Sequence, residues 1–482
     1  MKQADIFEQR RSGVLLHITS LPAGNMGADA YRFVDFLAEA GVSVWQMLPL
    51  GPTHDDRSPY QCLSAHAGNN RLICRNMLKA QPWAEAKTIS DPKMSRLIAN
   101  AYRQFDLHAD EEEKQAYKDF CVQQQYWLDD YVLYREIRHL NQSRAWFDWP
   151  QELRDRDPEA MRKVTTEREN ALQIRRFEQF IFFRQWHQLR DYANGKGVKL
   201  FGDMPIFVAH DSADVWAERA LFTLDDSGQA TRVAGVPPDY FSETGQRWGN
   251  PLYDWQKHID QNFDWWRRRL QTQLELFDLI RIDHFRGFEA CWEIPASCET
   301  AIDGQWVTAP GEQLFDRLLE LFGELPLVAE DLGIITDEVT ALREKYGMPG
   351  MKILQFAFGG DASNPYLPHQ QCEDSVTYTG THDNNTTLGW YEALEPHVKA
   401  HMHSYMGETS EAMPWLFIRS ALSSVSELAV VPFQDLLSLG AEHRMNVPGT
   451  IEGNWGWRFS WDMVPDAIPA KLKALNDLYG RV

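Results

Sequence analysis

Clustered cysteines are missing from this 482-residue sequence. The chain has six cysteines, but none of them form a CxxC pair and no group of histidines stands beside them. This scatter argues against a metal or redox centre, and a chain of this length does not need disulfides for stability. We therefore expect reduced thiols, no metal and no cofactor.

An excess of basic residues is missing too. Lys and Arg together number 48 against 69 Asp and Glu, which gives a net charge of −21. Nucleic acids bind to basic patches that neutralise their phosphates, so this balance argues against a nucleic-acid partner. An uncharged ligand fits the composition more easily.

Long apolar runs are also absent. Residues 41–51 form one of the longest runs, and a segment of that length is far too short to cross a bilayer. Residues 1–13 are polar and charged, without the apolar stretch and small-residue cleavage site of a secretory signal. The sequence thus predicts a cytoplasmic protein without a membrane partner.

Aromatic residues, by contrast, are plentiful. The chain has 18 Trp, 16 Tyr and 25 Phe. Flat aromatic faces stack well on the C–H faces of sugars, but aromatic side chains also fill protein cores. The composition alone therefore favours a carbohydrate ligand only slightly.

Eight short runs of β-forming residues alternate with helical patterns. Most runs are nearly continuous in apolar residues, as expected for strands buried on both faces of a parallel sheet. Helical periodicity lies between several of them, for example over residues 29–40, 174–192 and 314–322. This alternation predicts an α/β protein with a (β/α)8 barrel. The predicted strands are residues 13–19, 42–49, 198–207, 279–285, 325–331, 351–358, 375–383 and 428–433.

The spacing of these runs is uneven, and no repeat, low-complexity run or Pro- or Ser-rich linker divides the chain. We therefore predict one catalytic domain over residues 1–482. The gap between the second and third strands is far longer than a usual crossover, so residues 53–197 are expected to form a mainly helical insertion above the barrel mouth. A second insertion is expected over residues 208–277, with a Pro-, Gly- and aromatic-rich segment at 236–255 that covers the substrate.

Acidic side chains gather at the predicted ends of the strands. Barrel enzymes place their chemistry at the C-terminal ends of their strands. Several acids without a metal motif suit glycosidic chemistry, which needs one carboxylate as nucleophile and another to protonate the leaving oxygen. The polar residues at these ends are Asp203, Arg281, Asp283, Glu330, His382 and Asp383.

Other interpretations of these residues stay open at this point. An Asp that ends a strand often caps the next helix, and this is what we expect of Asp331. Arg281 and Asp283 alternate with Ile280 and Ile282, so both should point toward the barrel axis. A purely structural Arg–Asp pair would have the same spacing. Three single histidines are expected to be hydrogen-bonded core or loop residues rather than catalysts, namely His17, His210 and His284.

An ordered set of motifs carries a much more specific signal. The set resembles the amylomaltase or disproportionating-enzyme family of 4-α-glucanotransferases, in the family's own order from Leu16 to Arg458. The motifs are HITSLP, WQMLPLGPT, SPYQ, GDMPIFVAHDSADVW, GVPPDYFSETGQRWGNPLYDW, RIDHFRGF, VAEDLG, PGMKILQFAF, NPYLPH, THDNNTTLGW and MNVPGTIEGNWGWR.

This resemblance implies an enzyme that cuts an α-1,4-glucan and transfers the segment to another glucan or to glucose, with retention. It makes Asp283 the nucleophile, Glu330 the general acid/base and Asp383 the third acid, which holds sugar hydroxyls. Glucans would be both donor and acceptor, and no cofactor is implied. The substrate-binding residues that it implies are Tyr60, Asp203, Tyr240, Phe241, Trp248, Arg281, His382 and Asn454.

The sequence departs from the family at residues 24–29, at His54-Asp55-Asp56 and at Asn70-Arg71. These departures concern accessory glucan binding and chain-length preference, not the three acids. Two rival functions remain open. An α-amylase-type hydrolase would use the same acids, and a non-catalytic glucan-binding barrel would need none of them. The sequence does not predict the oligomeric state.

Overall fold

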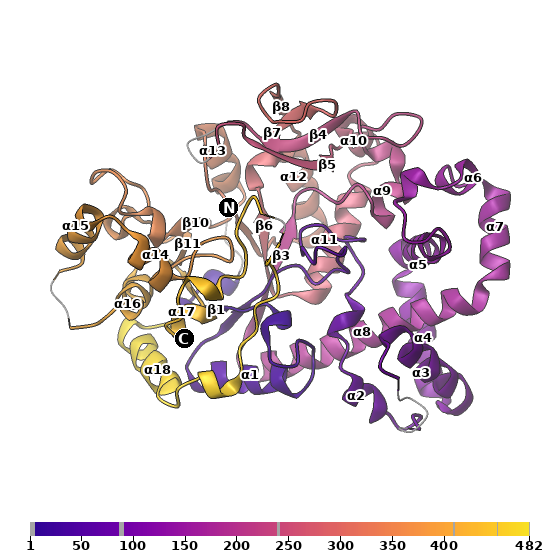
Figure 1. Cartoon of the computed structure of the whole chain (residues 1–482), viewed down its shortest axis with the longest axis horizontal. Coiled ribbons are helices and arrows are strands. Elements are labelled where there is room, and N and C mark those ends of the chain that lie inside the picture. Colours follow the sequence, from indigo (N-terminus) through magenta and orange to yellow (C-terminus); the bar gives the residue numbers. More distant parts are fainter. Residues whose placement is uncertain (1–4, 86–90, 239–241, 408–409, 451, 482) are drawn as a thin grey trace.

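The largest element of the computed structural model, which describes residues 5–85, 91–238, 242–407, 410–450 and 452–481, is a sheet of parallel strands. Eight strands pair in the order β10-β11-β12-β1-β2-β3-β6-β9. Several of them are labelled near the middle of Figure 1. Each predicted strand region overlaps one of them, so the (β/α)8 barrel is confirmed. The strands are β1 (Arg11–Leu15), β2 (Val44–Gln46), β3 (Lys199–Pro205), β6 (Leu279–Asp283), β9 (Leu327–Ala329), β10 (Gly350–Ile353), β11 (Ser375–Tyr378) and β12 (Leu428–Pro432).

The two end strands of this order, β9 and β10, lie side by side and close the barrel. The Ala329 N–H donates to the Pro349 carbonyl at 2.9 Å, and the Met351 N–H donates to Asp331 Oδ1 at 2.7 Å. The expectation that Asp331 caps the next helix is wrong. Helix α13 (Asp337–Lys345) begins only after Thr336, and the Asp331 carboxylate is instead bound to the neighbouring strand.

Side chains of the barrel strands alternate between the barrel interior and the outer helices. On β6, Leu279, Arg281 and Asp283 face inward, whereas Ile280 and Ile282 pack outward. The inward apolar residues fill the barrel below the polar ones, so the acids at the strand ends stand on a packed base. This base includes Leu15, Val44, Phe201, Leu279, Val328, Met351, Val376 and Leu428.

Each predicted strand extends past the observed strand at its C-terminal end. Residues 354–356 belong to a 3-10 turn, and residues 379–383 form the loop after β11. These residues are largely buried, because the chain around the barrel mouth covers them. The apolar pattern at these positions therefore indicates buried residues rather than residues paired in a strand.

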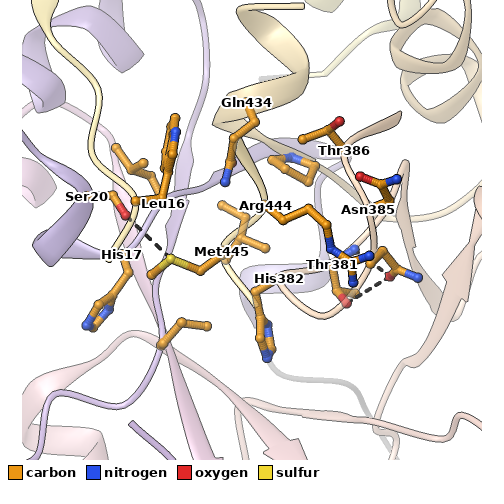
Figure 2. Close-up of a pocket in the computed structure, with 15 residues that line it drawn as sticks. Leu16, His17, Ser20, Thr381, His382, Asn385, Thr386, Gln434, Arg444 and Met445 are labelled. Carbon is orange, nitrogen blue, oxygen red and sulfur yellow. Dashed lines mark hydrogen bonds between the residues drawn. The ribbon is translucent and has the colours of Figure 1, made fainter. Parts of the chain in front are cut away.

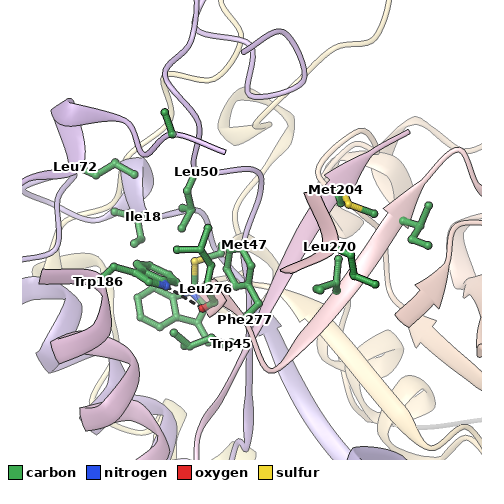
Figure 3. Packing of buried hydrophobic residues seen from close by; sticks show 14 of the residues in the cluster. Ile18, Trp45, Met47, Leu50, Leu72, Trp186, Met204, Leu270, Leu276 and Phe277 are labelled. Carbon is green, nitrogen blue, oxygen red and sulfur yellow. Dashed lines mark hydrogen bonds between the residues drawn. The ribbon is translucent and has the colours of Figure 1, made fainter. Parts of the chain in front are cut away.

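Helices cover the outer face of the barrel (Figure 1). The cluster drawn in Figure 3 shows how they pack: Trp186 of α8 joins Trp45 of β2 in one core and donates its indole N–H to the Leu276 carbonyl of α11 at 2.8 Å. Between β10 and β11, residues 354–374, all of them described, hold only 3-10 turns, so this position of the ring has no α-helix. The ring helices are α1 (Ala28–Glu39), α8 (Glu169–Gly195), α11 (Asp264–Leu276), α12 (Gly311–Phe322), α13, α16 (Trp415–Ser423) and α18 (Ile468–Tyr479).

A group of further helices follows β2 and lies to one side of the barrel (Figure 1). The long helix α8 ties this group to the barrel, since it contacts α3, α4, α5 and α7 as well as strand β3. Buried Glu136 of α5 accepts hydrogen bonds from Arg168 and Arg175, which fixes α5 against the start of α8. The helices of this group are α2 (Arg75–Lys79), α3 (Met94–His108), α4 (Glu111–Gln123), α5 (Gln125–Leu140), α6 (Gln151–Arg154) and α7 (Pro158–Glu167).

A small antiparallel sheet beside the barrel mouth was not predicted from the sequence. Its strands pair in the order β5-β4-β7-β8, and its bounds are β4 (Arg232–Val236), β5 (Gln246–Pro251), β7 (Ala290–Pro295) and β8 (Gln305–Thr308). Two strands come from the segment before β6 and two from the segment after it. The short strands and the glycines within β4 and β5 hid the pattern.

The remaining helices are α9 (Ala213–Ala217), α10 (Trp255–Asp260), α14 (Thr387–Ala393), α15 (Pro396–Met406) and α17 (Phe433–Leu436). Over the described residues, no helix is both long enough and apolar enough to cross a membrane. No group of three or more His, Cys, Asp or Glu within those same residues could hold a metal ion.

Candidate active site

The candidate site lies at the C-terminal ends of β3, β6, β9 and β11. Asp203 belongs to β3, Arg281 and Asp283 belong to β6, and Glu330 directly follows β9. A glycine makes room behind the first of these acids. A Cβ at Gly202 would lie 2.2 Å from Phe277 Cδ2, so only a residue without a side chain lets the end of α11 pack against β3 there.

One half of the site is a network of charged and polar side chains, which we call the charged half: Tyr60, Asp203, Arg281, Asp283, His382 and Asp383. Its centre is Arg281. This guanidinium donates to both oxygens of Asp203, at 2.9 and 2.7 Å, and to Asp283 Oδ1 at 2.9 Å. The prediction that Arg281 and Asp283 point toward the barrel axis is confirmed.

Burial separates the members of the charged half into two layers. Asp203 is 1% exposed and Arg281 is 4% exposed, whereas the side chains of Asp283 and Asp383 are 30% and 45% exposed. The lower layer therefore acts as support, because its charges are used within the protein. The upper layer presents two carboxylates to whatever enters the barrel mouth.

Tyr60 and His382 connect this support to the second exposed acid. The Tyr60 hydroxyl donates to Asp203 Oδ2 at 2.7 Å and lies 2.8 Å from His382 Nε2. Burial and the charge of Asp203 raise the pKa of Tyr60 well above its ordinary value, so the hydroxyl keeps its proton. Since that proton goes to Asp203, the Tyr60 oxygen must accept from an Nε2–H of His382. Asp383 Oδ2 lies 3.2 Å from the same nitrogen.

The His382–Asp383 pair favours its charged form. Burial lowers the pKa of His382, but the charge of Asp383 and the hydrogen bond between them outweigh it, and the net shift is upward. Burial likewise raises the pKa of Asp383, but His382, the Asn446 amide and Arg281 hold it well below its ordinary value. Asp383 is therefore a carboxylate across the working pH range of most enzymes.

The other half of the site, which we call the acid–base half, consists of Glu330, His284 and Trp248. Glu330 is held by backbone groups rather than by side-chain charges. Its Oε2 accepts from the His284 N–H at 2.7 Å, and its Oε1 accepts from the Leu332 N–H at 3.2 Å. Burial raises the pKa of Glu330 to about 7, with help from the charges of Asp283 and Asp331 and against Arg281 and the His284 N–H.

A carboxyl group with a pKa near 7 can both give and take a proton at neutral pH. Beside it, the neighbouring strand presents a half-exposed carboxylate, Asp283. Two acids with such different surroundings are what a retaining glycosidic mechanism requires, one as nucleophile and one as acid/base.

Known proteins resemble the chain over nearly all of its length. Residues 16–463 match the family described as 4-alpha-glucanotransferase. The 4-alpha-glucanotransferase of Thermus thermophilus is 46% identical, over 98% of this chain and 99% of its own length, and that of Synechocystis is 43% identical over 99% of both. The chain belongs to the 4-alpha-glucanotransferase family. Among solved structures, an amylomaltase from Streptococcus agalactiae in complex with acarbose has a TM-score of 0.93 and 37% identity, over 98% of this chain and 100% of that one.

Membership in the 4-alpha-glucanotransferase family confirms the family resemblance drawn from the motifs. An amylomaltase from Corynebacterium glutamicum, only 17% identical, shares the fold with a TM-score of 0.77 over 99% of this chain and 76% of that one. The matches favour the glucanotransferase function over the two rivals, an α-amylase-type hydrolase and a non-catalytic barrel. They do not assign roles to single residues.

Trp248 on β5 belongs to the segment that was predicted to cover the substrate. It lies beside His284, the residue whose backbone N–H donates to Glu330. Its ring meets the His284 ring edge to face, with centroids 4.8 Å apart. Tyr240 and Phe241 lie outside the described residues. The described part of this segment thus contacts His284 through Trp248.

Asn454 lies in the loop that was predicted to border the cleft, but its amide is used within that loop. It accepts from the Val447 N–H at 2.9 Å and donates to the Thr450 carbonyl at 2.9 Å. The next residue, Trp455, reaches the charged half, with its ring centroid 5.9 Å from Tyr60 and 6.1 Å from His382. Trp455 stands in the GNW motif, so the sequence did contain a signal for it.

Two further supports of Asp383 were missed by the sequence analysis. Asn446 Nδ2 donates to Asp383 Oδ1 at 2.6 Å. Fully buried Asp435 of α17 accepts from the Thr379 and Thr387 hydroxyls, at 2.7 and 2.5 Å, and thereby ties both ends of the segment around Asp383 to α17. Asn446 belongs to the MNVPGT motif, but no spacing in the sequence connects Asp435 with residues 379–387.

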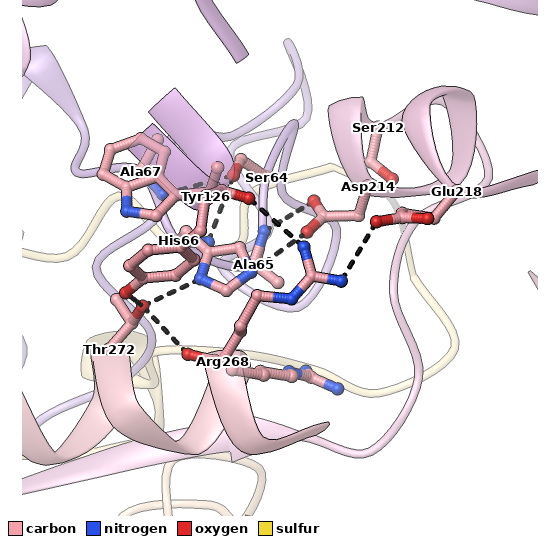
Figure 4. Close-up of polar contacts among 12 residues, drawn as sticks. Ser64, Ala65, His66, Ala67, Tyr126, Ser212, Asp214, Glu218, Arg268 and Thr272 are labelled. Carbon is pink, nitrogen blue, oxygen red and sulfur yellow. Dashed lines mark hydrogen bonds and ion pairs between the residues drawn. The ribbon is translucent and has the colours of Figure 1, made fainter. Parts of the chain in front are cut away.

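Buried polar contacts also fix the loop that carries Tyr60 (Figure 4). The Ala65 N–H donates to Asp214 Oδ2 at 2.8 Å, and His66 Nδ1 lies 2.8 Å from Thr272 Oγ1. The Tyr126 hydroxyl of α5 lies 2.7 Å from the same Thr272 oxygen. These contacts join the loop to α9, α11 and α5, so the helices after β2 help to position Tyr60.

A pocket adjoins the charged half at the ends of β1, β11 and β12 (Figure 2). Polar and apolar side chains line it together, among them His17, His382, Gln434, Arg444 and Trp457. The Arg444 guanidinium donates to the Asp383 carbonyl at 2.9 Å. His382 faces both this pocket and Tyr60, so the pocket continues the candidate active site of this family member.

Proposed function

We propose that the enzyme cuts α-1,4-glucans and passes the freed segment to the 4-hydroxyl of another glucan or of glucose. The relatives are named 4-alpha-glucanotransferases, and the Streptococcus amylomaltase was solved with acarbose. One observation carries the proposal for this chain: partly exposed Asp283 and partly buried Glu330, whose pKa is about 7, end neighbouring strands of one barrel.

The proposed reaction is a double displacement with retention. A carboxylate oxygen of Asp283 attacks the anomeric carbon, the glycosidic C–O bond breaks, and Glu330 gives its proton to the leaving oxygen. Glu330, now a carboxylate, takes the proton of an incoming 4-hydroxyl as that oxygen attacks the same carbon and releases Asp283. Each step uses the opposite form of Glu330, which a pKa near neutrality serves well.

The other residues of the charged half are proposed to bind the sugar. Asp383 and His382 would accept and donate hydrogen bonds with the hydroxyls of the residue being cleaved. Arg281 fixes Asp283 through the 2.9 Å bond, while Asp203 and Tyr60 support Arg281 and His382 from below. Asn454 is proposed to shape the loop that holds Trp455 beside this site.

The segment at residues 236–255 is proposed to cover the cleft, with Tyr240 and Phe241 against the glucan. A cover that excludes water lets a sugar acceptor compete for the intermediate, which favours transfer over hydrolysis. The insertions at 53–197 and 208–277 would build the walls of the cleft on one barrel domain. A cytoplasmic location is also proposed, and it agrees with the six unpaired cysteines.

Incubation with pure maltotriose tests this function. We expect glucose together with a ladder of longer oligosaccharides, each longer by the transferred segment. A product mixture of only maltose and glucose would instead identify a hydrolase. No reaction at all would favour a non-catalytic barrel, provided that the protein is shown to be folded by its melting transition.

A further inference from the structure

The residue after the proposed nucleophile has an unusual backbone. His284 has φ 56° and ψ 53°, the left-handed conformation. Residues with a Cβ rarely adopt it, although Asn, Asp and His do so more often than most, and β-branched residues resist it strongly. Strained conformations of this kind persist only where the surrounding structure enforces them, and they gather at functional sites.

The left-handed turn at His284 has one clear structural consequence. It directs the His284 N–H to Glu330 Oε2, at 2.7 Å. The Phe285 N–H then donates to the Glu330 carbonyl at 3.1 Å. Because β6 and the Phe285 N–H fix the chain on both sides, an extended residue at position 284 would require the Asp283–His284 peptide to rotate, and that rotation would turn the His284 N–H away from the carboxyl group.

Packing rather than hydrogen bonding holds the His284 ring. Its Nε2 is buried and has no hydrogen-bond partner in the part of the chain that the structure describes. On one side the ring meets Trp248 at 4.8 Å. On the other side it lies over Gly287, where a Cβ would come within 3.3 Å of His284 Cδ2. Trp248 therefore packs against His284, the residue whose backbone N–H holds Glu330.

The charge of the ring does not explain this arrangement. Burial lowers the pKa of His284 to about 4, so the ring is neutral where the enzyme would work. The charged and titratable groups that act on Glu330 come from β6, from its own segment and from the loop after β10; they are Arg281, Asp283, Asp331 and Tyr366. His284 directly follows β6, and its backbone N–H is the hydrogen bond that this segment donates to the Glu330 carboxylate.

We infer that His284 is a positioning residue, whose left-handed backbone, enforced by the packing of Trp248 and Gly287, aims its N–H at Glu330. This inference rests on the proposed function, in which Glu330 is the acid/base. It also connects the small sheet to the chemistry, because β5 supplies Trp248.

Substitutions that differ in their tolerance of the left-handed region test the inference. His284→Asn and His284→Gly can keep the turn and the N–H, whereas His284→Val opposes the turn. A hydrogen bond to the ionised carboxylate lowers its pKa, so loss of this bond should raise it. In His284→Val we expect the basic limb of the pH profile of kcat to move up by about one pH unit or more. The same variant should lose at least about tenfold in kcat, while His284→Asn keeps both features.

A matched control separates this effect from general strain. Ser143 is exposed and left-handed, with φ 63°, in the turn after α5. Ser143→Val should lower the melting temperature without moving the pH limb. An unmoved limb in His284→Val, or equal losses in the Asn and Val variants, would overturn the inference. The second outcome would mean that the ring itself is required.

A fluoride donor distinguishes failure of this inference from failure of the proposed function. Maltosyl fluoride releases fluoride without a proton from Glu330, so His284→Val should form the intermediate from it at nearly the unsubstituted rate. A large loss with this donor would show that the turn serves Asp283 instead and would overturn the inference. If the basic limb with maltotriose survives in Glu330→Gln, the acid/base assignment itself fails, whatever the His284 variants do.

Discussion

The charged half and the acid–base half hold their carboxylates by different means. In the charged half, buried Arg281 and Asp203 fix each other, and Asp283 is attached to the same guanidinium. In the acid–base half, Glu330 is bound by two backbone N–H groups, and the ring of one donor residue, His284, packs against Trp248. Backbone N–H groups carry no net charge, so a desolvated carboxyl group that they hold can keep its proton near neutral pH, as the raised pKa of Glu330 indicates.

This difference predicts how each half should respond when one of its residues is substituted. A network of paired charges breaks as a unit, because each removed partner leaves another charge buried and unpaired. A carboxyl group that depends on backbone geometry should fail more gradually, through its pKa and its orientation. Substitutions in the two halves should therefore differ both in the size and in the kind of their effects.

Asp283→Asn should abolish transfer. The amide keeps the shape of the side chain and can still accept from Arg281, but it cannot form the covalent bond to the anomeric carbon. We expect kcat to fall by about 10⁴-fold or more, roughly 5 kcal/mol of barrier. Product separation after incubation with maltotriose measures this loss. Asp303→Asn, at an exposed position outside the site, should behave like the unsubstituted enzyme, and appreciable transfer by Asp283→Asn would refute the assignment.

Glu330→Gln should remove the basic limb of the pH profile. The first step needs protonated Glu330, and burial sets its pKa at about 7. The protonated fraction, and with it this step, therefore declines as the pH rises through about 7. With maltotriose we expect a loss of about 10²–10⁴-fold, and the remaining activity should no longer fall on the basic side. A basic limb that persisted in this variant would point to another acid.

Arg281→Met should disrupt the network of ion pairs and hydrogen bonds in the charged half. It leaves Asp203, 1% exposed, without its counter-charge, which should cost about 3–5 kcal/mol of stability. Adding Asp203→Asn removes that buried charge, so the double variant should regain most of the stability without regaining activity. Denaturant melts of both variants measure this. If the double variant were no more stable than the single one, burial of an unpaired Asp203 charge would not be the cause.

The barrel and the proposed acids could be predicted because both leave local marks on the sequence. Continuous apolar runs give the strands, and the alternation of Arg281 and Asp283 with isoleucines gives their direction. The same alternation along a strand predicts that the side chains of Glu330 and Asp331 point in opposite directions, since neighbouring residues on a strand face opposite sides. We assigned Asp331 to a helix cap, but its carboxylate binds the Met351 N–H across the barrel closure.

What the sequence did not reveal depends on contacts between distant segments. Asp435 supports the loop of Asp383 from helix α17, and the small sheet joins strands from both sides of β6. The left-handed turn at His284 depends on packing against Trp248 and Gly287, and a histidine at position 284 does not by itself predict it. Such features follow from packing in three dimensions, which residue patterns along the chain do not encode.

The smallest expected effect concerns the cover over the acid–base half. Trp248→Ala removes the ring that meets His284 at 4.8 Å and that belongs to the proposed covering segment. An aromatic contact of this kind contributes about 1–1.5 kcal/mol beyond its buried area, so acceptor capture should weaken about tenfold. Water then competes better for the intermediate, and the share of hydrolysis from maltotriose should rise while Asp283 and Asp383, which are held by the charged half, stay in place.

A tryptophan on the same small sheet provides the control. Trp306 of β8 is 38% exposed and packs against Trp292 and Arg286 rather than His284. Trp306→Ala should therefore leave the ratio of glucose release to transfer unchanged. If Trp248 only packs the sheet onto the barrel, Trp248→Ala will lower the melting temperature and both activities together, at a constant ratio. A raised ratio in Trp248→Ala but not in Trp306→Ala would show that the cover acts on the choice between acceptor and water.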